Sequence, residues 1–395
     1  MRVKVLFATL IGIDFILLLL QIRGLSIGYH EARIVYGDPS ALQLLLNLSF
    51  SLFGQNDYAL RIPMILLHLS SVILLYAMSK YYVTRDQDRL WVVLIYTLLP
   101  GVISSALVVD NAGLMIATLF LFGYVYLRYG IYAIGVLPLL VWIDPAFVYL
   151  FIAITLYGIY HRKLRWIVAG ILTLGASLYF YGIEIGGSPE SRFLDLLGVY
   201  SAIFSPIVFI YLFYVLYRRL IAKERDLIWM IAITAFLISL FLSFRQKVDV
   251  QTFAPFLLLA LPLAAQTFFK TYRVRLREFR GRYRILFYTA FLLLVLNALV
   301  VFFNQWIYPL LQNPARHFAY PMHVAKELAH TLKEERIRCI NTSEEKLQLR
   351  LRFYGITQCD SYQLTDGYTS EGKKVTISYI NTPVFVGYVT KINKN

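Results

Sequence analysis

Apolar stretches of roughly 20 residues recur along most of this chain, with short polar segments between them. An α-helix needs about 20 apolar residues in a row to cross the hydrocarbon core of a bilayer. The pattern predicts a helical protein with about 11 membrane spans, at residues 5–22, 62–82, 90–104, 112–127, 131–143, 146–160, 166–181, 200–217, 227–243, 252–269 and 285–303.

One apolar stretch, 41–53, differs from the others because it carries a regular polar stripe. Gln43, Asn47 and Ser51 recur every four residues and so share one face of a helix. Such a helix would be about 20 Å long, too short to span a bilayer. We expect it to lie in the plane of the membrane interface.

The pattern changes near residue 311, where long apolar runs end. Shorter periodic segments there predict helices at 324–335 and 344–352 and strands at 338–341, 374–380 and 384–390. We therefore expect a transmembrane domain at 1–310 and a small α/β domain at 311–395. Cys339 and Cys359 are the only cysteines, and they either form a disulfide or remain two buried thiols.

Composition agrees with a membrane protein, since 59% of the 395 residues are hydrophobic and 15% are charged. The net charge of +15 has a topological explanation, because Lys and Arg crowd alternate loops, such as 80–89, 162–165, 218–225 and 270–284. We expect membrane lipids and no nucleic acid as partners. The bias predicts a cytoplasmic N-terminus, and an odd number of spans then places the C-terminal domain outside.

Candidate chemistry begins directly after the first apolar run, at Tyr29-His30-Glu31-Ala32-Arg33. This stretch combines an acid, an imidazole and a guanidinium at the membrane surface. Asp110 stands in an otherwise apolar stretch, where poor solvation favours a raised pKa or a cationic or metal partner. The plainer alternative for each acid is a solvated loop residue. Asp14, inside the first span, is assigned no role.

A second candidate group contains Arg245 and Lys247, in a loop where the topology predicts few cations. A guanidinium and an ammonium at the headgroup level suit a phosphate or pyrophosphate. Contact with anionic lipid headgroups explains them equally well.

The order of these motifs resembles the GT-C glycosyltransferases, of the protein O-mannosyltransferase and bacterial lipid A aminoarabinose transferase type. That family carries an Asp-Glu pair, an in-plane helix, an Arg-x-Pro that opens the next span, and a later Asp. The matching positions are His30-Glu31, 41–53, Arg61-Ile62-Pro63 and Asp110. A later basic residue before a proline-containing span matches Lys247 to Pro255, and the C-terminal domain also fits. His30 replaces the family's first acid.

The resemblance implies a hexosyl- or pentosyltransferase in the bacterial inner membrane. It would pass a sugar from a polyprenyl-phosphate donor to a glycan, lipid or protein on the outer face. Glu31 would be the general base. Arg33, Arg61, Arg245 and Lys247 would bind the substrate, and Asp110 would orient the acceptor or His30, or help to hold a divalent cation.

Three alternatives stay open. His30 is the base in place of Glu31, or the loop binds without catalysing, so that the protein is a non-catalytic binding homologue. A transporter or flippase for lipid-linked sugars is the third. Such proteins usually place charged residues near the bilayer midplane and show repeat symmetry.

Overall fold

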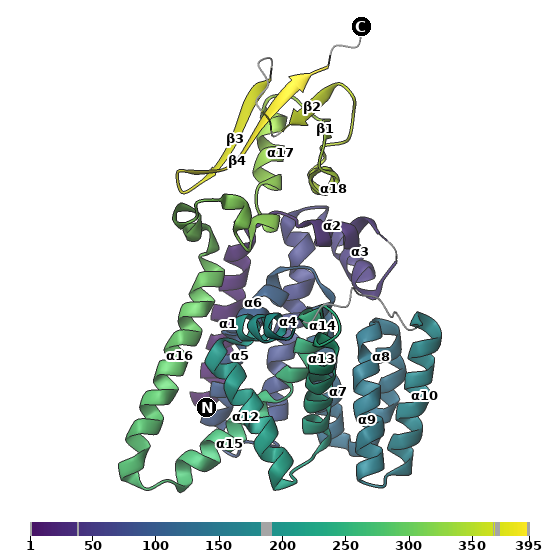
Figure 1. Cartoon of the computed structure of the whole chain (residues 1–395), viewed down its shortest axis with the longest axis vertical. Coiled ribbons are helices and arrows are strands. Elements are labelled where there is room, and N and C mark those ends of the chain that lie inside the picture. The colour runs from purple at the N-terminus through teal and green to yellow at the C-terminus, as the bar shows by residue number, and fades with distance from the viewer. Residues whose placement is uncertain (1, 38, 183–191, 366, 368–371, 393–395) are drawn as a thin grey trace. The chain divides into compact units, whose positions relative to one another are not determined.

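The computed structural model describes residues 2–37, 39–182, 192–365, 367 and 372–392, and most of them are helical (Figure 1). Contacts divide the chain into two units. The first unit is Met1–Phe15, Met64–Ala106 and Asn111–Ala298. The second unit is Ile16–Pro63, Leu107–Asp110 and Leu299–Asn395.

Apolar helices build the first unit. In chain order they are α1 (Arg2–Ile22), α4 (Asp57–Ser79), α5 (Asp86–Thr97), α6 (Pro100–Leu107), α7 (Asn111–Tyr129), η1 (Gly130–Val136), α8 (Leu137–Ile143), η2 (Pro145–Phe147), α9 (Val148–Tyr160), α10 (Leu164–Tyr181), α11 (Phe193–Phe204), α12 (Pro206–Ala222), α13 (Leu227–Ser243), α14 (Val250–Leu258), α15 (Leu261–Val274), η3 (Arg277–Phe279) and α16 (Arg280–Phe302). Of these, α1, α4, α6 and α16 also contribute residues to the second unit.

Five segments of the described chain are long and apolar enough to cross a membrane: α1, α4, Asn111–Ile143, α10 and Arg277–Phe302. Three bent pairs of helices raise this number to eight if each pair is one span. The bends are 65° between α5 and α6, 107° between α11 and α12, and 44° between α14 and α15. The predicted helical membrane protein is confirmed, and the number of about 11 spans stays a prediction.

Prolines account for the three bends. Pro100, Pro206 and Pro262 each stand in the first turn of the second helix of a pair. A proline has no backbone N–H and its ring obstructs the preceding turn, so it is tolerated at a helix start and ends the helix before it. The spans predicted across these three positions are therefore broken in the structure.

Close helix packing in the first unit is clearest between α9 and α10. Gly158 of α9 faces the backbone of α10, and a Cβ added there would lie 2.7 Å from the nitrogen of Ile167. Gly170 of α10 returns the contact, with a Cβ that would lie 2.9 Å from the nitrogen of Thr155. Membrane helices depend on such small residues, because lipid supplies no hydrophobic force between helices.

A polar pair lies within the apolar surroundings of α1 and α4. His68 Nε2 is 2.7 Å from Asp14 Oδ2, and both residues are buried. The ring of Tyr96 stacks on His68, with centroids 5.8 Å apart, and its hydroxyl shares a hydrogen bond of 2.6 Å with Ser71. The intramembrane acid seen in the sequence therefore has a partner on a neighbouring helix.

The second unit holds the remaining helices and a four-stranded sheet in the order β1-β2-β4-β3. Its elements are α2 (Tyr29–Tyr36), α3 (Ala41–Phe53), η4 (Asn304–Leu310), η5 (Pro314–Arg316), η6 (Tyr320–Met322), α17 (Ala325–Glu334), β1 (Asn341–Thr342), α18 (Glu345–Phe353), β2 (Tyr362–Thr365), β3 (Lys373–Tyr379) and β4 (Thr382–Lys391). Strands β1 and β2 are parallel, and the other neighbours are antiparallel.

The sequence predicted most of this small C-terminal region. Helices α17 and α18 and strands β3 and β4 lie within two residues of their predicted bounds. The strand predicted at 338–341 begins later, as β1, and β2 was not predicted. Leu328 and Leu332 of α17 pack in the same core as Val375 and Ile377 of β3.

The predicted helix at 41–53 is α3, with the predicted bounds. The placement of α3 in the membrane plane stays a prediction. The domain boundary near 311 also stays a prediction.

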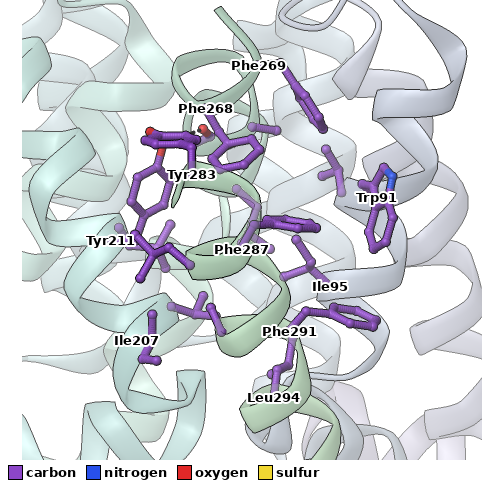
Figure 2. A pocket seen from close by; sticks show the side chains of 18 residues that line it. Trp91, Ile95, Ile207, Tyr211, Phe268, Phe269, Tyr283, Phe287, Phe291 and Leu294 are labelled. Carbon is purple, nitrogen blue, oxygen red and sulfur yellow. Dashed lines mark hydrogen bonds between the residues drawn. The ribbon is translucent and has the colours of Figure 1, made fainter. Parts of the chain in front are cut away.

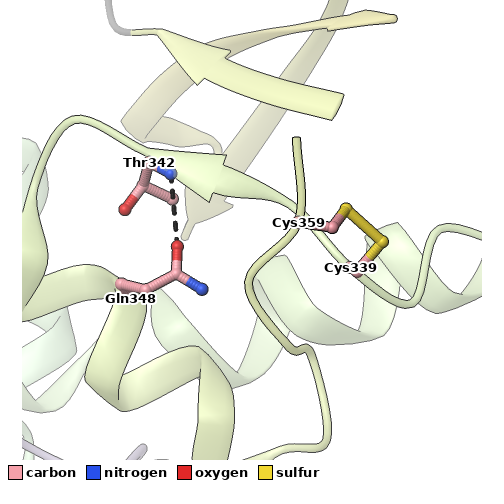
Figure 3. The surroundings of a disulfide bond; sticks show 4 residues. All are labelled: Cys339, Thr342, Gln348 and Cys359. Carbon is pink, nitrogen blue, oxygen red and sulfur yellow. Dashed lines mark hydrogen bonds between the residues drawn. A yellow bond between two sulfur atoms is a disulfide. The ribbon is translucent and has the colours of Figure 1, made fainter. Parts of the chain in front are cut away.

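Cys339 and Cys359 form a disulfide, which settles the alternative that the sequence left open (Figure 3). The two cysteines are 20 residues apart in the chain. Nearby, the backbone N–H of Thr342 donates to the side chain of Gln348 at 3.2 Å. The disulfide joins the segment before β1 to the segment before β2, and the hydrogen bond joins β1 to α18.

The Asp14–His68 pair should contribute to stability. Asp14→Leu leaves His68 without its partner, so we expect a lower melting temperature in detergent, equivalent to about 1–2 kcal/mol. Asp14→Leu with His68→Leu should recover part of the loss, because no orphaned polar group remains. Thr9→Val, on an exposed position of α1, is the matched control. Strictly additive single and double effects would show that the two residues are not coupled.

Candidate active site

The candidate site is built on α2, a helix of eight residues that follows the first apolar run. Gly28 is its N-cap, so Glu31 occupies the third helical position. A Glu at this position can reach back to the N-cap backbone, and Glu31 Oε2 accepts a hydrogen bond of 2.6 Å from the N–H of Gly28. The Glu31 side chain is fully buried.

Arg61 of α4 is the ionic partner of Glu31. Its Nη1 is 2.6 Å from Glu31 Oε1, and the Arg61 side chain is also fully buried. Nη1 donates in addition to the carbonyl of Leu107 at 2.8 Å, and Nη2 donates to the carbonyl of Ser26 at 2.7 Å. One guanidinium thus joins α2, the segment before α2 and the connector between α6 and α7.

The same connector carries Asp110. Glu31 Oε1 accepts a second hydrogen bond, of 2.8 Å, from the N–H of Val109. Because Glu31 and Arg61 bind the connector at two points, the residue after Val109 is placed beside α2. There, Asp110 Oδ1 lies 3.6 Å from Nε2 of His30. The buried Glu31–Arg61 pair therefore positions a second pair.

His30 and Asp110 differ from the buried pair in exposure. The His30 side chain is 61% exposed and that of Asp110 is 17% exposed. Interaction with the Asp110 carboxylate raises the pKa of His30 above its ordinary value, and it outweighs the opposing effect of partial burial. Arg33, one turn further along α2, is exposed and opposes the rise.

Two residues of the C-terminal region hold the segment before α2, and the sequence reading missed both. Arg350 of α18 donates from Nε to the carbonyl of Ile27 at 2.9 Å. The N–H of Ile27 donates to the hydroxyl of Tyr354 at 2.9 Å, and that hydroxyl donates to Asp57 at 2.7 Å. Helices α2 and α18 also pack against each other.

Arg350 did leave a signal in the sequence. It stands three residues after Leu347 and directly before Leu351, both of which are buried. This spacing places a cation on the apolar face of a helix. An arginine at such a position needs a carbonyl or a carboxylate as its partner. The sequence could not show that the partner lies more than 300 residues away.

Arg245 and Lys247 belong to the first unit, in the segment between α13 and α14, and both are exposed. His30, Glu31, Arg61 and Asp110 lie together in the second unit, with Arg33 on the same helix as His30. Within the described residues, no group of three His, Cys, Asp or Glu side chains could hold a metal ion.

Comparisons with known proteins identify the fold. No protein-family model and no curated sequence matches this chain. ArnT from Cupriavidus metallidurans in the apo state is similar in structure, with a TM-score of 0.55 and 12% identity over 98% of this chain and 97% of that one. The same ArnT bound to undecaprenyl phosphate gives a TM-score of 0.49 at 12% identity, with the same coverage. The predicted resemblance to ArnT and its GT-C fold is confirmed for the fold.

The buried pair should be essential for stability. Glu31→Gln keeps the shape of the side chain but leaves the Arg61 charge buried without a counter-charge, so we expect a loss of about 3–5 kcal/mol. Adding Arg61→Met to Glu31→Gln should restore part of this loss, since no unpaired charge then remains. Thermal unfolding of the purified protein in detergent measures both effects.

The neighbouring substitution His30→Asn is the control, because His30 is exposed and should melt close to the wild type. Wild-type stability of Glu31→Gln would show that the Glu31–Arg61 pair contributes nothing to the fold.

Proposed function

We propose that this protein transfers a sugar from a polyprenyl-phosphate donor to a glycan, lipid or protein acceptor at the outer face of a bacterial inner membrane. One observation carries the proposal: in a chain with the fold of ArnT, an exposed histidine is paired with a partly buried aspartate, and a fully buried Glu–Arg pair holds the two in place. The ArnT structure with undecaprenyl phosphate names the lipid class of that protein, and for this chain the lipid is part of the proposal.

The geometry favours His30 over Glu31 as the general base. Glu31 accepts hydrogen bonds from Arg61, Gly28 and Val109, and its side chain is inaccessible. Its two oxygens are occupied by these three donors, one of which is the ionic partner Arg61, so neither oxygen is open to an acceptor hydroxyl. His30 is exposed and faces Asp110. Glu31 and Arg61 are therefore assigned to positioning.

The chemical step balances with His30 as the base. The acceptor hydroxyl oxygen bonds to the anomeric carbon while the bond from that carbon to the phosphate oxygen breaks. The electron pair of the broken bond leaves with the polyprenyl phosphate, and His30 takes the hydroxyl proton. Asp110 faces Nε2, which favours a proton on that nitrogen and leaves Nδ1 to accept the second.

An exposed cation beside the His–Asp pair would bind the phosphate. Arg33 stands one turn from His30 on α2 and is exposed. A guanidinium presents several donors to phosphate oxygens. Charge that grows on the leaving phosphate would then be stabilised by Arg33.

Release of free polyprenyl phosphate tests the proposal. Purified protein is incubated with polyprenyl-phosphate sugars and an extract of envelope acceptors, and the freed lipid phosphate is measured. His30→Gln should lower turnover by about 10²–10⁴-fold, the usual contribution of a general base. The control is His330→Gln, because His330 is also exposed and also faces a carboxylate, Glu334, at 3.4 Å.

This assay, together with measurements of donor transport in vesicles and of donor binding, distinguishes the candidate functions. Release by the wild type that persists in His30→Gln would remove His30 as the base. Transport of the donor without its cleavage would favour a flippase, and donor binding with neither would favour a non-catalytic homologue.

The pH dependence follows from the His30–Asp110 pair. The base must be neutral, and the His30 pKa is raised above 6.5. Turnover should therefore rise with pH through that raised pKa and be lost below it. Asp110→Asn removes the main cause of the rise, so the acid limb of the kcat/KM profile should move to lower pH while the maximal rate falls. An acid limb that is identical in Asp110→Asn would contradict the pairing.

A further inference from the structure

An apolar cavity of about 150 Å³ lies among α5, α12, α15 and α16 of the first unit (Figure 2). Its wall comprises aliphatic and aromatic side chains of all four helices, including Trp91, Tyr211, Phe268, Tyr283 and Phe287. Cavities of this kind do not hold water, because water needs polar partners. The occupant must therefore contribute an apolar chain or group.

Basic residues surround the chain segment that joins two walls of this cavity. Between residues 270 and 284, where α15 leads through η3 into α16, seven residues are basic and Glu278 is the one acid. The basic residues are Lys270, Arg273, Arg275, Arg277, Arg280, Arg282 and Arg284. Apart from Arg273 and Arg280, all of them are exposed.

Two of these cations are already engaged within the protein. Arg273 forms an ion pair with Asp88 of α5, which ties the segment to another wall of the cavity. Arg280 donates to the carbonyls of Arg275 and Arg273, at 2.9 and 3.0 Å. These bonds hold the turn between α15 and α16 in place. The other five basic residues are exposed, so a ligand can reach their charges.

Arg275 connects the cationic segment to the cavity itself. Its guanidinium carbon lies 4.5 Å from the centroid of the Tyr283 ring, and Tyr283 lines the cavity. The guanidinium of Arg273 similarly lies 5.6 Å from the Phe269 ring, which also lines it. Positive charge therefore stands directly at an apolar site.

We infer that this cavity binds a short segment of one acyl chain of an anionic phospholipid, whose phosphate meets Arg275 and the exposed cations beside it. The topological bias explains why this loop is basic, and the contact of Arg275 with Tyr283 in addition places a guanidinium at the cavity itself. A neutral apolar molecule would not use that guanidinium, and a free phosphate would leave the cavity empty. Basic pockets between membrane helices suit acidic lipid headgroups. The inference concerns the first unit and does not depend on the proposed transferase activity.

Trp91 makes the inference directly testable, because it lines the cavity and brominated acyl chains quench tryptophan only at short range. The full-length protein is reconstituted in phosphatidylcholine vesicles containing a small, fixed fraction of brominated lipid. The signal of Trp91 is the difference between wild type and Trp91→Phe. Brominated phosphatidylglycerol should quench it with an apparent affinity at least about fivefold above that of brominated phosphatidylcholine.

Two substitutions examine the charge and the cavity separately. Arg275→Ala should lower the preference for phosphatidylglycerol by about fivefold, whereas Arg2→Ala, another exposed arginine of this unit, should not. Ala290→Phe adds a ring inside the cavity and should lower quenching by either lipid. Thermal unfolding of each variant confirms that it is folded.

Equal quenching of Trp91 by the two brominated lipids would show ordinary contact with bulk lipid and overturn the inference. Quenching that unlabelled polyprenyl phosphate relieves, but unlabelled phosphatidylglycerol does not, would assign the cavity to a lipid-linked substrate and overturn it as well.

Discussion

The burial of Glu31 together with Arg61 is the constraint on which the candidate site depends. Two opposite charges removed from water are stable only with good mutual geometry and additional hydrogen bonds. Here each charge binds backbone groups as well as its partner, and of the polar side-chain atoms of this pair only Nε of the Arg61 guanidinium has no hydrogen-bond acceptor among the described residues. Those backbone groups belong to the segment before α2 and to the connector between α6 and α7. An unpaired buried charge would cost free energy of folding. This cost therefore holds α2, the segment before α2 and the connector between α6 and α7 in place together.

This arrangement gives His30 and Glu31, which are adjacent on α2, different surroundings. Consecutive residues of a helix point in different directions, so Glu31 faces the interior while His30 faces solvent. The connector bound by Glu31 then presents Asp110 to His30. In the proposed reaction, Glu31 positions the site and His30 accepts the proton. Arg350 and Tyr354 support the arrangement by holding Ile27, directly before the helix.

Local sequence patterns predicted the helices and strands that depend on residues close together in the chain. The apolar runs identified the membrane helices, the spacing of polar residues gave α3, and periodicity gave α17 and α18. Pro100, Pro206 and Pro262 were visible but were read as parts of continuous spans, although each ends a helix. Contacts between distant segments had no such signal. The bonds of Arg350 to the residues before α2 depend on tertiary packing, which periodicity does not encode.

The most direct measurement is the titration of His30 by NMR with labelled histidine, in the wild type and in Glu31→Gln. The chain has six histidines, and His30→Asn identifies the signal. The account predicts a His30 pKa above 6.5 in the wild type and a return toward the ordinary value in Glu31→Gln. That substitution removes the anchor that holds α2 beside Asp110, and it also removes the Glu31 charge, which makes a smaller contribution to the raised pKa. A raised pKa that persists unchanged in Glu31→Gln, or an ordinary pKa in the wild type, would contradict the claim that the buried pair positions the reactive one.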